Sequence, residues 1–329
     1  MLHNDLTNDM NTNMNTNTKT NMKTMATSRF PTSPEDQVRQ AAISIKEATK
    51  DGKHRHAIRL LLPIIGATEL DDWPGGARQM MEAASPLIKN VMMMQPQQDP
   101  DQQDPDQSED TSKMKMEIAE SVIDEADGVR ALFGQAPSSS SKDDCCSVLL
   151  PSADTVEKLM ELDQQVGPER NLIVVNSQWR RKTDFGMGLA FFGNGKRDEK
   201  IQFVERFEPT FHCSNIMVEG DIIRVLRTYP GPWRVYLRVV ADENVAIAAD
   251  TMSIDWVEIG SKDLVMSKTK EWESKAKADD ADQDGGKLFD YGIPSYSEIT
   301  VMITSREGYV PKSLSERAAA AFAFIKDTL

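Results

Sequence analysis

The chain has 329 residues, which is long enough for one large or two modest domains with a sizeable core. Its hydrophobic fraction of 39% lies below the usual globular range, so we expect part of the chain to stay outside any packed core. The formal net charge of −14 disfavours a nucleic-acid partner, because neutralising phosphates requires a basic stripe that this sequence lacks.

Membrane and redox signals in the sequence are both weak. No run of about eighteen apolar residues occurs, so we expect no transmembrane segment, and peripheral membrane contact stays open. The three cysteines, Cys145, Cys146 and Cys213, form no CxxC pair and are odd in number. This pattern argues against a secreted disulfide framework and predicts free thiols in a reducing compartment.

Residues 1–32 are predicted to be a low-complexity tail. They are rich in Thr, Asn and Met, and no acid occurs between Met10 and Pro34. This composition is typical of an organelle transit peptide and equally of a disordered tail, so both interpretations stay open. The apolar segment of a secretory signal is missing.

The first folded elements are predicted to be a helix and a buried strand. Ser33, followed by Pro34 and two acids, predicts the start of the helix, and Gly52 predicts its end. The aliphatic run His56–Gly66 predicts a strand buried on both faces, as in parallel sheets. A second helical stripe follows Gly76.

The middle of the chain alternates between insertion, helices and strands. The acidic segment at about 95–112 cannot bury enough apolar surface to fold, so we predict a disordered insertion. Apolar residues at helical spacing predict a helix over Lys113–Gly134. Ser147–Pro151 and Asn171–Val175 predict two buried strands, joined by a helix that opens with the capping-box pair Asp154–Glu157. Strand, helix and strand at this spacing predict parallel crossovers.

From about Lys200 apolar and polar residues alternate. This pattern predicts a strand over Ile201–Phe207 and further strands joined by short turns such as VEGD and YPGPW. A second disordered insertion is predicted at about 267–286. It precedes a predicted strand, Glu298–Thr304, and a helix opened by the capping-box pair Ser313–Glu316.

The predicted architecture is a single α/β domain over residues 33–329. Its sheet is expected to be mainly parallel and Rossmann-like, flanked by helices, and extended by antiparallel strands in the C-terminal half. We find no internal repeat in the sequence.

The loop after the first predicted strand, GATELDDWPGG, lies where doubly wound folds bind phosphates. Its residues do not fit that role, because the P-loop lysine is missing and Asp71 and Asp72 would repel a phosphate unless a metal intervened. We favour a structural turn, in which Gly75 and Gly76 let the helix begin close to the sheet and Trp73 is an aromatic anchor.

The loop after the third predicted strand, NSQW, lies at the carboxyl end of that strand, where open parallel sheets bind ligands. Asn176 and Gln178 could orient a polar group. Trp179, with Arg180 and Arg181, could meet the acidic surface of a protein partner. The alternative is a solvated loop whose tryptophan covers the core. The two loops together define one candidate crevice for a ligand or partner, with the residues Asp71, Asp72, Trp73, Gly75, Gly76, Asn176, Gln178 and Trp179.

Two further patterns give weak site signals. Gly186–Lys196 lacks the third Rossmann glycine, and its Asn194–Gly195 pair is interpreted as a tight hairpin turn. His54 and His56 could ligate a metal, but no acid or cysteine stands near them in the sequence. We therefore interpret both as solvated residues at the start of a strand.

His212 and Cys213 do not make a catalytic pair. Neighbouring residues of a strand point to opposite faces, so the imidazole and the thiol cannot meet. The sequence contains no complete catalytic constellation, and we predict no catalytic residue, no cofactor and no metal site.

Two stretches together carry a family resemblance. They are LLLPIIGATELDDWPGGARQ, and VERFEPTFHC followed by LRTYPGPWRVY. Over about Ser33–Ile259 the chain resembles the plastid domain-of-unknown-function family nineteen-ninety-five, found in Low PSII Accumulation proteins and behind the kinase domain of some chloroplast adenylate kinases. In that family an aliphatic strand leads to a DDWPGG-like turn, and two late strands join at a YPGPW-like turn.

The resemblance implies an α/β domain in the chloroplast stroma with a part in photosystem II assembly or maintenance. The leading hypothesis is a non-enzymatic factor that binds protein partners such as photosystem II subunits or assembly factors. The rival hypothesis is a small-molecule or nucleotide-binding α/β enzyme that uses the candidate crevice. The resemblance supplies no catalytic residue, and the tail is not a clear targeting peptide.

Overall fold

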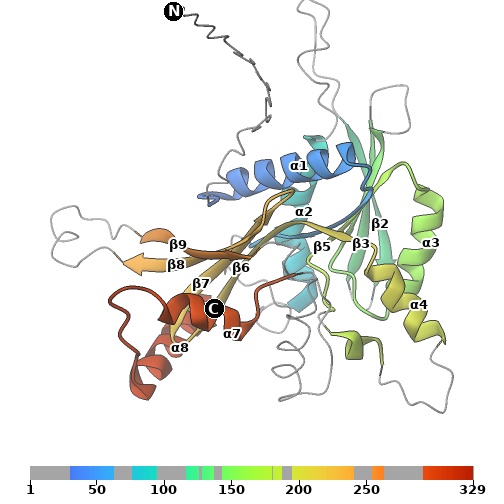
Figure 1. The fold of residues 1–329 in the computed structure, drawn as a ribbon. Coiled ribbons are helices and arrows are strands. Elements are labelled where there is room, and N and C mark those ends of the chain that lie inside the picture. Colours follow the sequence, from blue (N-terminus) through green and yellow to red (C-terminus); the bar gives the residue numbers. More distant parts are fainter. Residues whose placement is uncertain are drawn as a thin grey trace, which may run out of the picture.

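The computed structural model describes residues 30–62, 76–94, 116–125, 128–136, 143–179, 181–186, 195–240, 254–262 and 292–328. A nine-stranded sheet runs through this part of the chain, in the order β2-β3-β4-β5-β1-β6-β7-β8-β9 (Figure 1). The strands are β1 Arg55–Arg59, β2 Glu117–Asp124, β3 Val129–Gln135, β4 Cys145–Leu149, β5 Asn171–Val175, β6 Glu208–Val218, β7 Asp221–Thr228, β8 Trp233–Val240 and β9 Ile254–Lys262. The helices are α1 Pro34–Lys50, α2 Gly76–Met93, α3 Val156–Val166, the 3-10 helix η3 Lys182–Phe185, α4 Gly195–Val204, α7 Tyr296–Thr304 and α8 Leu314–Thr328.

Parallel strands form the centre of the sheet. Neighbours β4, β5, β1 and β6 all run in the same direction. Every residue of β4 is buried, as are Leu172–Val175 of β5, because helices cover both faces of these strands. The antiparallel strands β7, β8 and β9 extend the sheet beyond β6. The predicted α/β class, with antiparallel strands in the C-terminal half, is confirmed.

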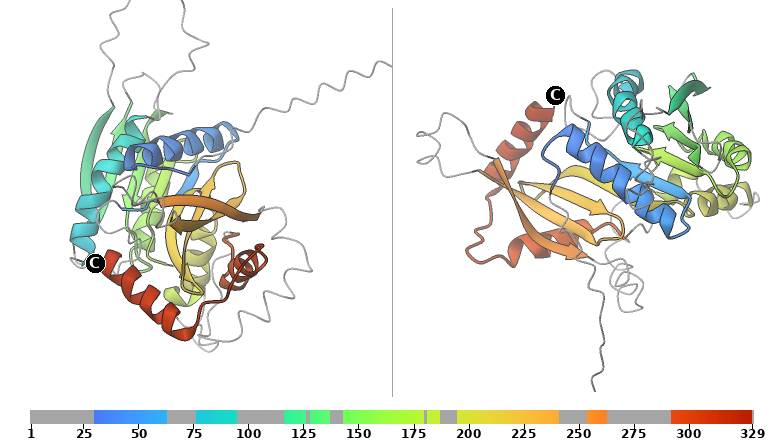
Figure 2. Two further views of the ribbon diagram at one scale, coloured as in Figure 1. Left: turned by 90° about the vertical axis from the view of Figure 1, so that its left-hand side faces the viewer. Right: turned by 90° about the horizontal axis from the view of Figure 1, so that it is seen from above.

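Helices cover the sheet on both sides (Figure 2). One face packs against α1 and α2, and the opposite face packs against α3 and α4 over β4 and β5. Helix α7 covers the β6 to β9 half on that second face, where Ile299 and Ile303 join a separate apolar cluster. The core therefore has one continuous cluster on the first face and two on the second.

The prediction of a helix over Lys113–Gly134 is wrong, because this segment forms the hairpin of β2 and β3. Strand β2 is an edge strand with mostly exposed residues, so burial imposes no alternation on its sequence. Its apolar residues happen to repeat at helical spacing. The sheet therefore carries an antiparallel extension at both ends.

Two predicted strands are helices. Ile201–Phe207 lies largely in α4, whose buried Ile201 and Val204 are spaced three residues apart, as on one side of a helix. Glu298–Thr304 lies in α7, which buries Ile299 and Ile303. The alternation that suggested a strand over Ile201–Phe207 did not decide its structure, and in both segments packing against the sheet determined the helix.

The predicted helix ends are partly confirmed. The Ser33 hydroxyl accepts from the Asp36 N–H at 3.1 Å and caps α1. The Ser313–Glu316 pair opens α8 as predicted. The predicted box at Asp154–Glu157 is wrong, because α3 has Thr155 at its N-cap and no side-chain capping bond. Gly195 is the first residue of α4 and not a hairpin residue.

The hairpins predicted around VEGD and YPGPW are confirmed by the antiparallel pairs β6–β7 and β7–β8. A Cβ on Gly231 would lie 2.9 Å from the Thr228 carbonyl oxygen, so only glycine fits this turn. The side chain of Trp233, at the start of β8, is fully buried. The predicted tail and both predicted insertions lie almost entirely outside the described residues, and their predictions stand as made.

Arg55 ties three elements together at the amino ends of the parallel strands. Its guanidinium is paired with the Asp163 carboxylate of α3 and donates to the carbonyls of His54 (3.0 Å), Arg170 (3.0 Å) and Gly167 (2.7 Å). Arg206 contacts the same carboxylate at 3.1 Å. The two arginines differ in burial, since the Arg55 side chain is 9% exposed and that of Arg206 is 53% exposed.

We expect Arg55→Gln to lower the free energy of unfolding by about 3 kcal/mol, because three carbonyls lose their donor and the Asp163 carboxylate keeps only its exposed partner Arg206. Arg206→Gln should cost less than about 1 kcal/mol, because that pair is exposed to water. Urea denaturation of both variants is the measurement. Equal losses would contradict the role given to Arg55.

Candidate functional site

The carboxyl ends of β1 and β5 are the natural ligand position in this topology. The two strands are neighbours, yet the chain leaves β1 toward α2 on one face and β5 toward α4 on the other. Connections that separate in this way open a crevice between them in α/β sheets. Of the predicted crevice residues, Asp71, Asp72, Trp73 and Gly75 lie outside the described residues, and Gly76 is the first residue of α2.

Asn176 lies at this position but bonds to the protein itself. Its side-chain oxygen accepts from the Leu60 N–H at 2.7 Å, and its amide nitrogen donates to the Leu60 carbonyl at 3.0 Å. Its own N–H donates to the Ile58 carbonyl at 2.9 Å. The residue is buried and has a positive φ of 47°. Asn176 therefore extends the pairing of β1 with β5 past the ends of both strands.

Gln178 and Trp179 also turn into the fold. The Gln178 side chain donates to the Leu150 carbonyl at 2.7 Å. Trp179 is only 3% exposed and lies against Phe185, with 6.0 Å between the ring centroids. Its indole N–H is buried and has no acceptor among the described residues. This arrangement agrees with a tryptophan that covers the core.

Replacing Asn176 separates a structural role from a ligand role. We expect Asn176→Gly to lower the free energy of unfolding by about 2 kcal/mol, because two buried groups of Leu60 lose their partner. Asn176→Ala should cost about 1 kcal/mol more, because an alanine Cβ is strained at positive φ. Urea denaturation measures both values. If Asn176 served a ligand alone, Asn176→Gly would leave stability unchanged, and Asn176→Ala would show only the backbone strain.

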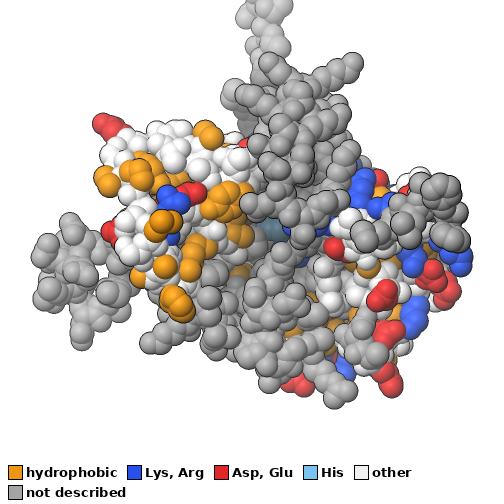
Figure 3. All heavy atoms as spheres, turned by 90° about the horizontal axis from the view of Figure 1, so that it is seen from below, with side chains coloured by type: hydrophobic (Ala, Val, Ile, Leu, Met, Phe, Trp, Pro, Cys, Tyr) orange, Lys and Arg blue, Asp and Glu red, His pale blue; other side chains and the backbone are white. Residues whose placement is uncertain are grey.

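A row of basic side chains, missed by the sequence analysis, crosses three strands beside this position. The pairing register places Arg59 of β1 opposite His212 of β6, and His212 opposite Arg227 of β7. The Arg59 guanidinium donates to the Ser177 carbonyl at 3.1 Å. This row lies between the two apolar clusters of the second face, on which Figure 3 shows basic side chains beside a hydrophobic region.

His212 is held in its neutral form. Burial first, and then the charges of Arg59 and Arg227, keep the pKa of its imidazole well below the usual range. Its ring lies edge-on to Trp233, with 5.0 Å between the centroids, whereas Cys213 packs into the cluster under α1 and α2. The prediction that His212 and Cys213 point to opposite faces is confirmed.

A second polar group lies at the amino ends of the parallel strands. The interpretation of both early histidines as solvated is wrong for His56, which is fully buried. His54 Nδ1 and His56 Nε2 each lie 3.2 Å from Oδ1 of Asn171, and His56 Nδ1 lies 3.0 Å from the Thr210 hydroxyl. Thr49 of α1 also contacts this amide oxygen, at 3.2 Å. The network links α1, β1, β5 and β6.

His56 should make stability depend on pH. Burial is the main cause that lowers its pKa from 6.5 to about 4. The unfolded chain therefore binds a proton more readily, so this contribution is complete above pH 6.5 and is lost as the pH falls from 6.5 toward 4.

Between pH 7.5 and pH 5 we expect the wild-type protein to lose about 2 kcal/mol more than His56→Gln loses. Denaturant titrations of both proteins at the two pH values measure this difference. The same pH dependence in both proteins would show that His56 is not the titrating group.

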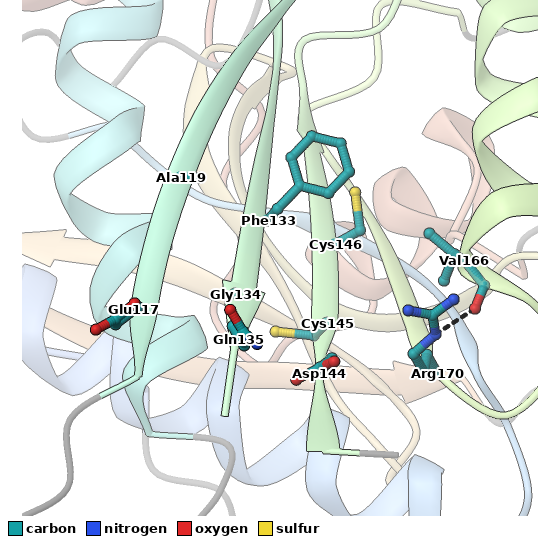
Figure 4. Close-up of a pocket in the computed structure, with 10 residues that line it drawn as sticks. All are labelled: Glu117, Ala119, Phe133, Gly134, Gln135, Asp144, Cys145, Cys146, Val166 and Arg170. Carbon is teal, nitrogen blue, oxygen red and sulfur yellow. Dashed lines mark hydrogen bonds between the residues drawn. The ribbon is translucent and has the colours of Figure 1, made fainter. Parts of the chain in front are cut away.

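Two cavities lie at the end of the sheet where the parallel strands begin. The smaller, of about 290 Å³, is lined by side chains of β2, β3, β4 and the end of α3 (Figure 4). Its Arg170 donates to the Val166 and Gln165 carbonyls at 2.5 and 2.6 Å, so it caps α3. Burial raises the pKa of both Cys145 and Cys146 to about 12, which keeps these thiols protonated and unreactive.

The larger cavity, of about 640 Å³, lies where β1, β5 and β6 begin. Charged side chains dominate its lining. Lys53 pairs with Glu208 at 3.2 Å, and Arg206 pairs with Asp163 at 3.1 Å. Its full lining is Gly52, Lys53, His54, Arg55, Asp163, Gln164, Gly167, Pro168, Arg206 and Glu208.

Metal-binding clusters and membrane-spanning helices are both absent from the described ranges. No three His, Cys, Asp or Glu side chains there gather as they would around a metal ion. None of the helices in the same ranges is both long and apolar enough to cross a bilayer.

The fold is thus that of a mixed α/β protein with a parallel centre and covered faces. A comparison with known protein families identifies the family of this chain. Residues 31–253 match the family described as Domain of unknown function (DUF1995). The chain belongs to this family, and the matched range agrees with the resemblance carried by the DDWPGG and YPGPW turns. No curated protein and no solved structure matched the chain.

Proposed function

We propose that this protein is a non-enzymatic factor of the chloroplast stroma that binds protein partners and acts in the assembly or maintenance of photosystem II. The plastid setting and the photosystem rest on the family resemblance. Protein binding is supported by one observation of the structure, the apolar outer surface of the two C-terminal helices.

This surface, named here the C-terminal apolar surface, exposes large side chains to water. Leu314 is 84% exposed and Phe322 is 75% exposed. Exposed apolar groups that gather in one region mark interaction sites, because burying them against a partner releases water. The hydrophobic side chains form an extended region on one part of the face in Figure 3. The C-terminal apolar surface comprises Tyr296, Val301, Val310, Leu314 and Phe322.

Polar contacts hold α8 in place, and Leu314 and Phe322 stay exposed to solvent. Lys312 donates to the Gly220 carbonyl at 2.7 Å and pairs with Asp221 at 2.6 Å, and Arg317 of α8 pairs with Glu219. A Cβ on Gly220 would lie 3.2 Å from the Arg317 Cα, so the turn between β6 and β7 and the helix approach closely. Leu314 and Phe322 are therefore not required to dock α8 on the sheet.

Both helices lie beyond the matched range 31–253. The C-terminal apolar surface would thus give this chain contacts additional to those of the shared domain.

The double variant Leu314→Ser/Phe322→Ser tests this proposal. We expect it to recover at least about tenfold less photosystem II subunit or assembly factor from a photosynthetic membrane extract, because the apolar contact area is lost. Pull-down followed by mass spectrometry is the measurement. Ile43→Ser is the matched control, since Ile43 is also exposed, at 53%, but lies on α1.

Two results would contradict the proposal. One is a wild-type protein that retains no photosystem subunit or assembly factor, and the other is a double variant that retains as much as the control. Unfolding curves of the three proteins should coincide within about 0.5 kcal/mol, because exposed surface substitutions have small effects on stability.

A second candidate function is a small-molecule or nucleotide-binding α/β enzyme. The observation that favours it is the topology, in which β1 and β5 send their connections to opposite faces of the sheet. In the described residues, however, the side chains predicted to reach a ligand there bond to the protein itself. Protein binding is therefore the leading proposal.

A further inference from the structure

We propose that the 640 Å³ cavity at the amino ends of β1, β5 and β6, named here the amino-end cavity, binds a small molecule through its phosphate or carboxylate group, with Lys53 and Arg206 as the principal ligands. This site lies at the end of the parallel strands opposite to the predicted crevice. The inference is independent of the protein-binding function, because the C-terminal apolar surface contributes no residue to the cavity.

Positive charge exceeds negative charge around the amino-end cavity. The Asp163 carboxylate is shared by Arg55 and Arg206, and the Glu208 carboxylate is shared by Lys53 and Arg227. Arg227 lies behind Glu208 and outside the lining, so three permanent cations, Lys53, Arg55 and Arg206, face the two acids in the cavity. In a chain with a formal net charge of −14, such a local excess is unusual and creates a site that attracts anions.

The four cations that pair with these acids divide into two roles. Arg55 and Arg227 are buried, and their guanidiniums hold the two carboxylates in place. Lys53 and Arg206 lie at the solvent side and have further N–H groups, because an ammonium has three donors and a guanidinium has five. Arg55 and Arg227 thus fix the positions of the two carboxylates, and Lys53 and Arg206 can turn toward a ligand.

The surrounding backbone keeps the amino-end cavity open. The positive φ angles of Gly52 (76°) and Gly167 (78°) lie on the turns that lead into β1 and β5, and no atom lies within 4 Å of a Cβ built on either residue. The volume also exceeds that of a bare phosphate and falls within the range of about 300–1,000 Å³ typical of ligand sites. The cavity therefore has room for a molecule larger than its anionic group.

Oxyanions fit this lining better than other ligands. Phosphate and carboxylate oxygens accept charge-assisted hydrogen bonds from arginine and lysine, which are about twice as strong as neutral ones. A metal ion would be repelled by the excess of cations. His54 also lines the cavity and adds a ring that can bond to a polar group of the ligand.

Calorimetric titration of the full chain at pH 7.5 and constant ionic strength tests the proposal, with inorganic phosphate in one arm and citrate in the other. We expect saturable binding in at least one arm. Arg206→Gln and Lys53→Gln should each weaken it at least about tenfold, because each removes a charge-assisted bond. Arg39→Gln is the matched control, since Arg39 is an exposed arginine paired with Asp36 on α1.

Each outcome decides the question. Saturation by phosphate alone, by citrate alone or by both supports the site and names the group that it takes. No saturation in either arm overturns the proposal, and so does binding that is equal in the two variants and the control. Two variants are used so that a folding defect in one leaves the other informative. The Leu314→Ser/Phe322→Ser protein should bind the probe normally, which separates this result from the test of protein binding.

Discussion

The central constraint on this protein is that its parallel strands must be buried on both faces. Strands β4 and β5 contain almost no side chain that tolerates water, so helices have to cover the sheet above and below. The chain meets this requirement by sending α2 to one face and α3 and α4 to the other. The opposite exits from β1 and β5, and the ligand position that they define at the carboxyl ends of these strands, follow from that alternation.

Features that depend on burial were readable from the sequence, and features that depend on contact with distant segments were not. Asn171–Val175 is a short aliphatic run that only a fully covered strand explains. Strand β2 is exposed at the sheet edge, so its sequence carries no comparable signal. Helix α7 consists largely of residues that favour strands, and the cluster around Ile299 and Ile303 overrides that preference.

The candidate site shows the same division. Asn176 was correctly placed at the carboxyl end of a central strand, but a polar residue there has the same sequence signature whether it bonds to a ligand or to a backbone. Its two bonds to Leu60 decide between these possibilities. The amino-end cavity combines residues from turns far apart in the chain, such as Lys53 and Arg206. No spacing rule connects them, because only the parallel pairing of β1 with β6 brings them together.

One irregularity in the pairing of β1 with β6 determines which side chains of β6 lie on each face of the sheet. Ala57 lies opposite Pro209 and Ile58 opposite Phe211, so Thr210 forms a bulge at a place where proline already lacks the N–H that a ladder needs. Without this extra residue the rest of β6 would be turned over. Phe211 and Cys213 would then lie among the arginines, and an imidazole would enter the aliphatic layer beneath α1. One threonine that has no opposite residue on β1 thus sets the polarity of both surfaces for the remainder of the strand.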